Sequence, residues 1–199
     1  MNLEQYLALF VFAAVSAFTP GPNNTLLLSS GMTFGFRRTV PMIFGVVVGF
    51  PLMIACVGLG LGEVFARFPM IYTVLKYAGA AYMLWLAFKI ATASRASEVA
   101  SENAKPLSFL QMAMFQWINP KGWVMAVTAL SAYTVGTNFY LGVSLVVGTF
   151  VLMGFGSATT WAGFGSSLRR VLNHPKHFRM INIALALTLV ASLWPMFRH

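Results

Sequence analysis

Acidic side chains are nearly absent from this 199-residue sequence. It contains no aspartate, only four acidic residues against 13 lysines and arginines, and a single cysteine. Charged residues make up 9% of the chain and hydrophobic residues 58%, whereas roughly a quarter of the residues of a soluble domain are charged. The composition therefore excludes an ordinary soluble domain and predicts an all-α integral membrane protein.

The same scarcity excludes several kinds of chemistry. Cys56 has no partner for a disulfide or a CxxC redox motif. His174 and His177 have metal-like spacing, but they flank a proline in a basic loop, and no metal site or cofactor is expected there. No nucleophile with a base can be assembled within the apolar stretches, so the sequence does not indicate an enzyme. The four glutamates, Glu4, Glu63, Glu98 and Glu102, fall in loops or at the ends of the apolar stretches. No carboxylate is therefore expected at the membrane midplane to form a proton relay.

The hydrophobic stretches predict six transmembrane helices in one domain, residues 1–199. A hydrocarbon core of roughly 30 Å needs about 20 apolar residues per helix. A polar stretch at about 93–106 is expected to be a cytoplasmic linker between two half-repeats, about 1–92 and 107–199. The expected spans are Leu3–Met32, Val40–Leu61, Met70–Ile90, Leu107–Ala132, Phe139–Gly163 and Met180–Met196.

The net charge of +9 is explained by the loops between these spans and does not indicate nucleic-acid binding. Arg67 and Arg198 fall on one side of the predicted membrane. By the positive-inside rule the other, more basic side is cytoplasmic, so both termini are expected in the periplasm. The cations on that basic side are Arg37, Arg38, Lys89, Arg95, Lys105, Arg169, Arg170, Lys176 and Arg179.

Prolines interrupt the first and the fourth predicted spans. Pro20 and Pro22, on either side of Gly21, remove two backbone donors, and Pro120, two residues before Gly122, removes one. In lipid an unsatisfied backbone group costs several kcal/mol, so a break survives only where it is buried in protein or lines a wet cavity. Both breaks are therefore candidate parts of a functional site.

The two breaks also indicate an inverted repeat. Pro20 and Pro120 each lie in the first span of a three-span half, 100 residues apart. Because each half has an odd number of spans, the second half would enter the membrane from the opposite side. Secondary transporters with this architecture bind substrate where paired broken helices meet.

The residues around the breaks suit a zwitterion such as an amino acid. The amides of Asn23, Asn24 and Thr25 begin a new helical stretch, whose positive end favours a carboxylate. The carbonyls expected to lose their helical partners, which could accept from an ammonium group, are those of Ser16, Phe18 and Gln116. The polar side chains expected to face inward are Ser16, Thr19 and Asn23 in the first span, and Gln116 and Asn119 with Trp123 in the fourth. The alternative is that these polar groups only hold the helices together.

Two lysines and two tryptophans lie within the predicted spans. Lys121 is about halfway through its span, where a lysine is costly unless it is paired or faces water. It could hold a substrate carboxylate or take part in coupling. Lys76 could also take part in coupling or line the cavity, but it is close enough to a span end for its amine to reach the membrane surface, and the two interpretations are equally good. Trp117 and Trp123 either line the cavity, where an indole face could meet an ammonium, or pack in the core.

Several motifs together resemble the LysE/RhtB family of bacterial amino-acid exporters, over essentially the whole chain. These are Thr19–Asn23 (TPGPN), Gly35–Arg37, Lys76–Met83 and Asn119–Lys121. Other stretches resemble the branch of that family that exports cysteine and O-acetylserine. They are Asn23–Asn24, Gly79–Tyr82, Ala87–Thr92, Lys105–Phe109 and Thr128–Ser131.

The resemblance implies an inner-membrane exporter of small neutral amino acids or their derivatives, of the cysteine and O-acetylserine type, with threonine or homoserine as further candidates. It also implies secondary transport, coupled to protons or another ion. The expected partners are the lipid bilayer, a small neutral amino acid and a second copy of the chain, and the sequence leaves open whether the unit is a monomer or a homodimer. A lysine exporter is less compatible, because a cationic side chain would find no carboxylate within the spans. The competing hypotheses are a six-helix membrane protein that handles ions or electrons and an assembly partner that transports nothing.

Overall fold

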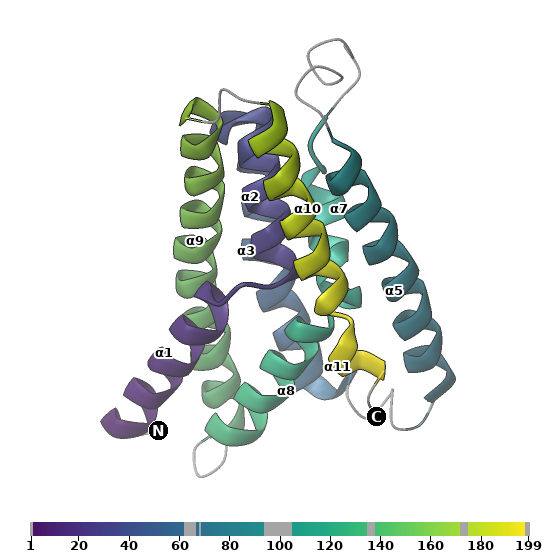
Figure 1. The fold of residues 1–199 in the computed structure, drawn as a ribbon. Helices are drawn as coiled ribbons and strands as arrows, with labels where there is room; N and C mark the ends of the chain where they lie inside the picture. Colours follow the sequence, from purple (N-terminus) through teal and green to yellow (C-terminus); the bar gives the residue numbers. More distant parts are fainter. Residues whose placement is uncertain are drawn as a thin grey trace.

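The computed structural model describes residues 2–61, 67, 69–93, 105–134, 138–171 and 175–197. Every element in these ranges is a helix, and the helices run roughly along one direction (Figure 1). Most of the predicted linker lies outside the described residues, as do Glu63, Arg95, His174 and Arg198. The all-helical class is confirmed for the part of the chain that the structure describes.

The first predicted break is confirmed. Helix α1 (Leu3–Phe18) starts with a capping box, in which Asn2 and Gln5 exchange side-chain and backbone hydrogen bonds. Helix α2 (Pro22–Phe34) follows after three residues at an angle of 49°. Pro22 is the first residue of α2, a position where a missing N–H costs nothing. The prolines thus end one helix and start the next.

The second span consists of α3 (Phe36–Cys56) and a π-helical turn, η1 (Val57–Leu61). Gly45 and Gly49 of α3 lie against α7 (Phe109–Phe115), as their spacing predicts for close helix contact. A Cβ atom on Gly49 would stand 2.6 Å from the Cα of Ala113, so only glycine fits there. The third span is α5 (Pro69–Thr92).

The second predicted break is also present, but it starts earlier than expected. After α7 the chain makes a 3-10 turn, η2 (Gln116–Ile118), and α8 (Pro120–Tyr133) starts at its proline. The prediction that the Gln116 carbonyl is free is wrong, because the tighter turn lets the Asn119 amide donate to it at 3.3 Å. Pro120 nevertheless interrupts the helix as predicted.

The last helices differ from the predicted bounds. Helix α9 (Phe139–Val171) continues eight residues past the expected end at Gly163, since no proline follows to stop it. Helix α10 (Pro175–Ala191) begins five residues before the expected Met180, with a proline at its first position, and α11 (Trp194–Phe197) ends the described chain.

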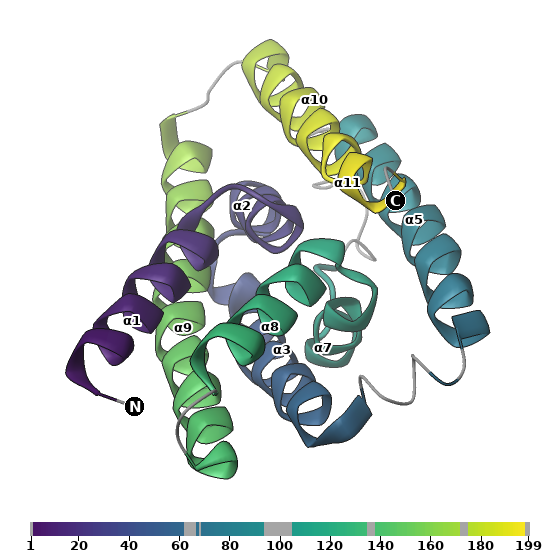
Figure 2. The same ribbon diagram turned by 90° about the horizontal axis from the view of Figure 1, so that it is seen from below.

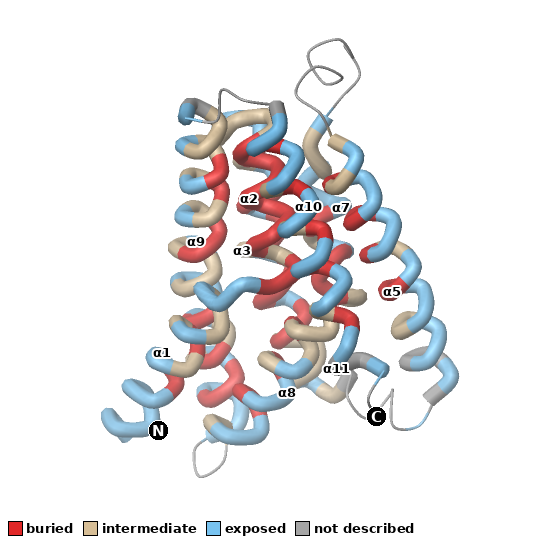
Figure 3. The backbone as a smooth tube through the Cα atoms, viewed as in Figure 1, coloured by how far each residue is buried: buried red, intermediate tan, exposed pale blue. Residues whose placement is uncertain are grey.

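Helix α2 lies at the centre of the bundle, with most of its residues buried (Figure 3). It packs on α9, α3 and α10, while α10 also packs along α5 at one side (Figure 2). Gly31 of α2 touches the Ala162 carbonyl of α9, and Gly165 of α9 touches the Leu28 carbonyl of α2. These glycines let the two backbones meet, which fixes where the first break stands relative to α9.

Length and hydropathy identify three helical segments able to cross a membrane: 36–60, 73–92 and 139–169. The bent pair of α1 and α2 makes a fourth candidate. Many large apolar side chains on the outside of the bundle are exposed, as expected of a surface that faces lipid. The chain is therefore a multi-pass membrane protein. The count of six spans and the inverted repeat remain predictions.

Candidate functional site

The two helix breaks meet inside the bundle through a pair of side-chain amides. Asn23 Nδ2 donates to Gln116 Oε1 at 2.8 Å, and Gln116 Nε2 donates to Asn23 Oδ1 at 3.1 Å. Gln116 is fully buried, and its amide also donates to the Met112 carbonyl of α7 at 2.9 Å. This reciprocal pair joins positions 93 residues apart and holds the start of α2 against the 3-10 turn.

Side chains take the carbonyls that the first break leaves without helical partners. Asn24 Nδ2 donates to the Ala17 carbonyl at 2.7 Å and to the Thr19 carbonyl at 2.9 Å. From α9, Ser157 Oγ donates to the same Ala17 carbonyl at 2.7 Å, and Trp161 Nε1 donates to the Phe18 carbonyl at 3.3 Å. The carbonyls of Ala17, Phe18 and Thr19 are thus satisfied within the protein, as the groups of a break in a membrane segment must be.

Lys121 connects the second break to the first. Its Nζ donates to the Thr19 carbonyl at 2.8 Å and to the Pro20 carbonyl at 3.4 Å. The side chain passes directly over Gly21, where a Cβ atom would stand 2.7 Å from Lys121 Cδ and 3.1 Å from Nζ. Gly21 is therefore needed for this approach, although its extended backbone could accept another residue.

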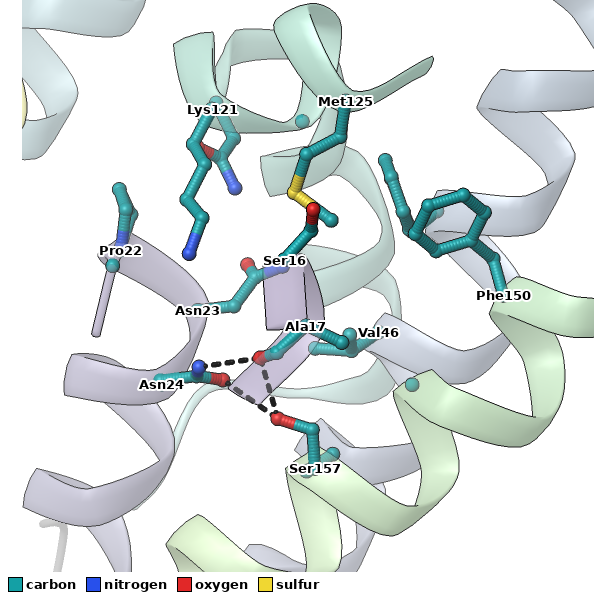
Figure 4. Close-up of a pocket in the computed structure, with 16 residues that line it drawn as sticks. Ser16, Ala17, Pro22, Asn23, Asn24, Val46, Lys121, Met125, Phe150 and Ser157 are labelled. Atoms are coloured by element: carbon teal, nitrogen blue, oxygen red, sulfur yellow. Dashed lines mark hydrogen bonds between the residues drawn. The ribbon is translucent and has the colours of Figure 1, made fainter. Parts of the chain in front are cut away.

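A small cavity lies where these groups converge, and we call it the break cavity (Figure 4). Its volume of about 40 Å³ is enough for a few water molecules and too small for an amino acid. No carboxylate occurs among the described residues that line it. The lining residues are Ser16, Ala17, Gly21, Pro22, Asn23, Asn24, Val46, Phe50, Asn119, Lys121, Gly122, Met125, Phe150, Gly154, Ser157 and Ala158.

The break cavity offers both positive charge and hydrogen-bond acceptors. The N-termini of α2 and α8 both border it, each with a proline in its first turn, and Lys121 brings a cation. Asn119 is 3% exposed, and its Oδ1 has no hydrogen-bond partner among the described residues. A buried acceptor without a partner is costly, so Asn119 is available to a donor that enters the cavity.

Some predicted residues lie away from the cavity. Thr19 contributes its carbonyl oxygen, but the expectation that its side chain faces inward is wrong, because the hydroxyl is exposed and donates to the Val15 carbonyl. Trp117 and Trp123 are not among the lining residues: the Trp123 indole donates to the Trp117 carbonyl at 2.9 Å, and both rings pack against the core. Lys76 of α5 is not among the lining residues either, and its Nζ lies 5.2 Å from the centre of the Phe197 ring.

Sequence reasoning missed the contribution of α9. Ser157 and Trp161 both bind carbonyls of the first break, yet they lie in a long apolar helix rich in glycine and alanine. No break, charge or motif marks them. The one feature of the sequence that could have indicated their role is their spacing of four residues, which puts two polar groups on one face of a helix.

The fold and this site define a membrane protein with two interrupted helices and a polar cavity between them, an arrangement that secondary transporters use to bind substrate. Among the described residues, no group of three or more His, Cys, Asp or Glu side chains could hold a metal ion. Residues 14–191 match the family model described as LysE type translocator. The chain belongs to this family.

Relatives with assigned names cover nearly the whole chain. The cysteine/O-acetylserine efflux protein of Salmonella typhimurium (strain LT2) is 37% identical over 190 residues, 92% of each chain. The cysteine/O-acetylserine efflux protein of Escherichia coli (strain K12) is 37% identical over 188 residues, again 92% of each chain. No solved structure matches the chain. The resemblance read from the sequence motifs is therefore confirmed.

Proposed function

We propose that this protein exports small neutral amino acids across the bacterial inner membrane, with cysteine and O-acetylserine as its main substrates. The family and the names of the relatives support this proposal. The observation that carries it is the break cavity, in which a cation and an acceptor without a partner border the same space. Threonine and homoserine are further candidate substrates.

The cavity chemistry matches the two charged groups that all amino acids share. A substrate carboxylate would bind Lys121 and the N-terminal amides of α2 and α8, where the helix dipoles favour negative charge. The substrate ammonium would donate to Asn119 Oδ1 and to carbonyls of the first break. A lysine side chain would meet no carboxylate among the described lining residues, which favours neutral substrates.

Binding requires the two breaks to separate, because the cavity has a volume of about 40 Å³. In the structure, Lys121 Nζ binds the Thr19 and Pro20 carbonyls. On substrate binding, Lys121 would exchange these carbonyls for the substrate carboxylate, and the substrate ammonium would take the released oxygens. We further propose that Lys121, the ionisable group among the described lining residues, participates in coupling export to the proton gradient. We also propose that both termini lie in the periplasm.

The test is flux from proteoliposomes loaded with labelled cysteine, O-acetylserine, threonine or lysine, with and without an imposed pH gradient. We expect saturable flux of the neutral compounds that the gradient accelerates, and none of lysine. Lys121→Met and Asn119→Ala should abolish it, whereas Lys176→Gln, at an exposed cation of α10, should not. Folded wild-type protein that moves none of the four compounds would refute the proposed substrates, and normal flux by both cavity variants would refute the proposed site.

A further inference from the structure

A second, larger cavity lies at the end of the bundle opposite the chain termini; we call it the basic chamber. It has a volume of about 450 Å³, within the range of roughly 300–1,000 Å³ typical of small-molecule sites. It lies between the C-terminal halves of α2 and α5, the start of α3 and the segment that leads into α7 (Figure 1). Unlike the break cavity, it has room for an amino acid.

The walls of the basic chamber favour an anion. Lys89 of α5 and Lys105, which precedes α7, both line it, and no carboxylate occurs among its described lining residues. Lys89 Nζ stands 4.6 Å from the centre of the Trp85 ring, which also lines the chamber. Ser29 and Ser30 of α2 add buried hydroxyls. Two cations from separate segments thus line one cavity.

The basic chamber and the break cavity are neighbours along two helices. On α3, Met42 borders the chamber and Val46 borders the break cavity, and these residues are one helical turn, about 6 Å, apart. On α2, Asn23 borders the break cavity, while Leu26 and Ser30 border the chamber. Asn23 and Ser30 are seven residues apart and share a helix face. The walls of the two cavities are therefore about one helical turn apart along α3.

We propose that the basic chamber is a substrate-binding site that the exported amino acid occupies before it reaches the helix breaks. Lys89 and Lys105 bind the substrate carboxylate, and the Trp85 ring forms part of the same wall. This inference rests on the proposed export function. It also follows from position, because both lysines belong to the basic, predicted cytoplasmic side, from which an exporter takes its substrate.

The first experiment measures export kinetics in vesicles of phosphatidylcholine alone. Lys89→Gln and Lys105→Gln should each raise the half-saturating cytoplasmic cysteine concentration about tenfold, the loss of one charge-assisted contact, with maximal flux unchanged. Lys176→Gln is the matched surface control and should change neither value. Unchanged half-saturation in both chamber variants, or an equal rise in the control, would overturn the proposal.

The second experiment reads the chamber without transport. Cysteine should produce a saturable change in tryptophan fluorescence that Trp85→Phe removes, Lys89→Gln weakens and Lys121→Met preserves. Cysteamine, which lacks the carboxylate, should not produce it. A signal from protein that transports nothing would reject export but keep the chamber site. Transport without the signal, or a signal produced by phosphatidylglycerol instead of cysteine, would reject the amino-acid site.

Discussion

Replacing Gly21 by alanine should impair transport without unfolding the protein. The new Cβ would stand 2.7 Å from Lys121 Cδ, whereas carbon atoms pack best at about 3.5–4.0 Å, so the side chain must move by about 1 Å. The Gly21 backbone is extended, with φ 179° and ψ 179°, so alanine causes no backbone strain. The displacement therefore falls on the flexible lysine side chain.

The size of the effect follows from the contact that is lost. The displaced Nζ gives up its 2.8 Å hydrogen bond to the Thr19 carbonyl. A hydrogen bond from a charged group contributes about 1.5–3 kcal/mol, equivalent to about 10–150-fold in an equilibrium constant. The Thr19 carbonyl keeps Asn24 as a donor at 2.9 Å, and alanine also lowers the entropy of the unfolded chain. Thermal stability should therefore change little.

The assay is cysteine flux per reconstituted molecule, together with the thermal unfolding midpoint of the same preparation. In the proposed cycle Lys121 leaves the Thr19 carbonyl when substrate binds, so the lost bond weakens the closed state of the two breaks and not the binding of substrate. We expect flux in Gly21→Ala to fall by up to about 10–150-fold because the breaks no longer close after each cycle, with a small change in the midpoint. Gly148→Ala on α9 is the matched control, because a Cβ at Gly148 meets nothing within 4 Å. It should transport like the wild type.

A double variant shows whether the two residues act together. Residues in direct contact have non-additive effects, and because Lys121→Met leaves no flux to lose, the coupling is read from the unfolding midpoint: Gly21→Ala should shift it by a different amount in the Lys121→Met background than in the wild type. Wild-type flux in Gly21→Ala, when Lys121→Met alone is inactive, would show that the position of the amine does not matter. That result would refute the role given to the bond between Lys121 and the first break.

Three further predictions concern stability and the thiol. Gly165→Val would push its side chain into the Leu28 carbonyl and should destabilise the fold by about 1–3 kcal/mol or more, seen as a lower unfolding midpoint. Gly163→Val is the control and should lower the midpoint less, because a Cβ at Gly163 meets nothing within 4 Å. Asn24→Leu removes donors at 2.7 and 2.9 Å and should cost about 1–3 kcal/mol by the same measurement; an unchanged midpoint would contradict its proposed structural role. Cys56→Ser should leave flux unchanged, and lost flux would restore the redox hypothesis.

Both helix breaks were predictable from the sequence because their cause is local. Proline has no N–H wherever the chain places it, and at Pro20, Pro22 and Pro120 a nearby glycine favours a break as well. Proline alone does not decide this, because α3 continues through Pro41 and Pro51. The start of the second break at Gln116 was not predictable in the same way. A 3-10 turn depends on what its side chains bond to, and Gln116 bonds to Asn23 across the bundle.

The chain by itself therefore determined the membrane class, the positions of the breaks, the polar residues near them and the family, since composition, missing donors and motifs are properties of the covalent sequence. Only the tertiary structure decided which groups satisfy the breaks. Ser157 and Lys121 lie more than 100 residues from the carbonyls that they bind. Such partners are chosen by helix packing, in which Gly31 and Gly165 set the approach of α2 to α9, and no local pattern encodes that distance.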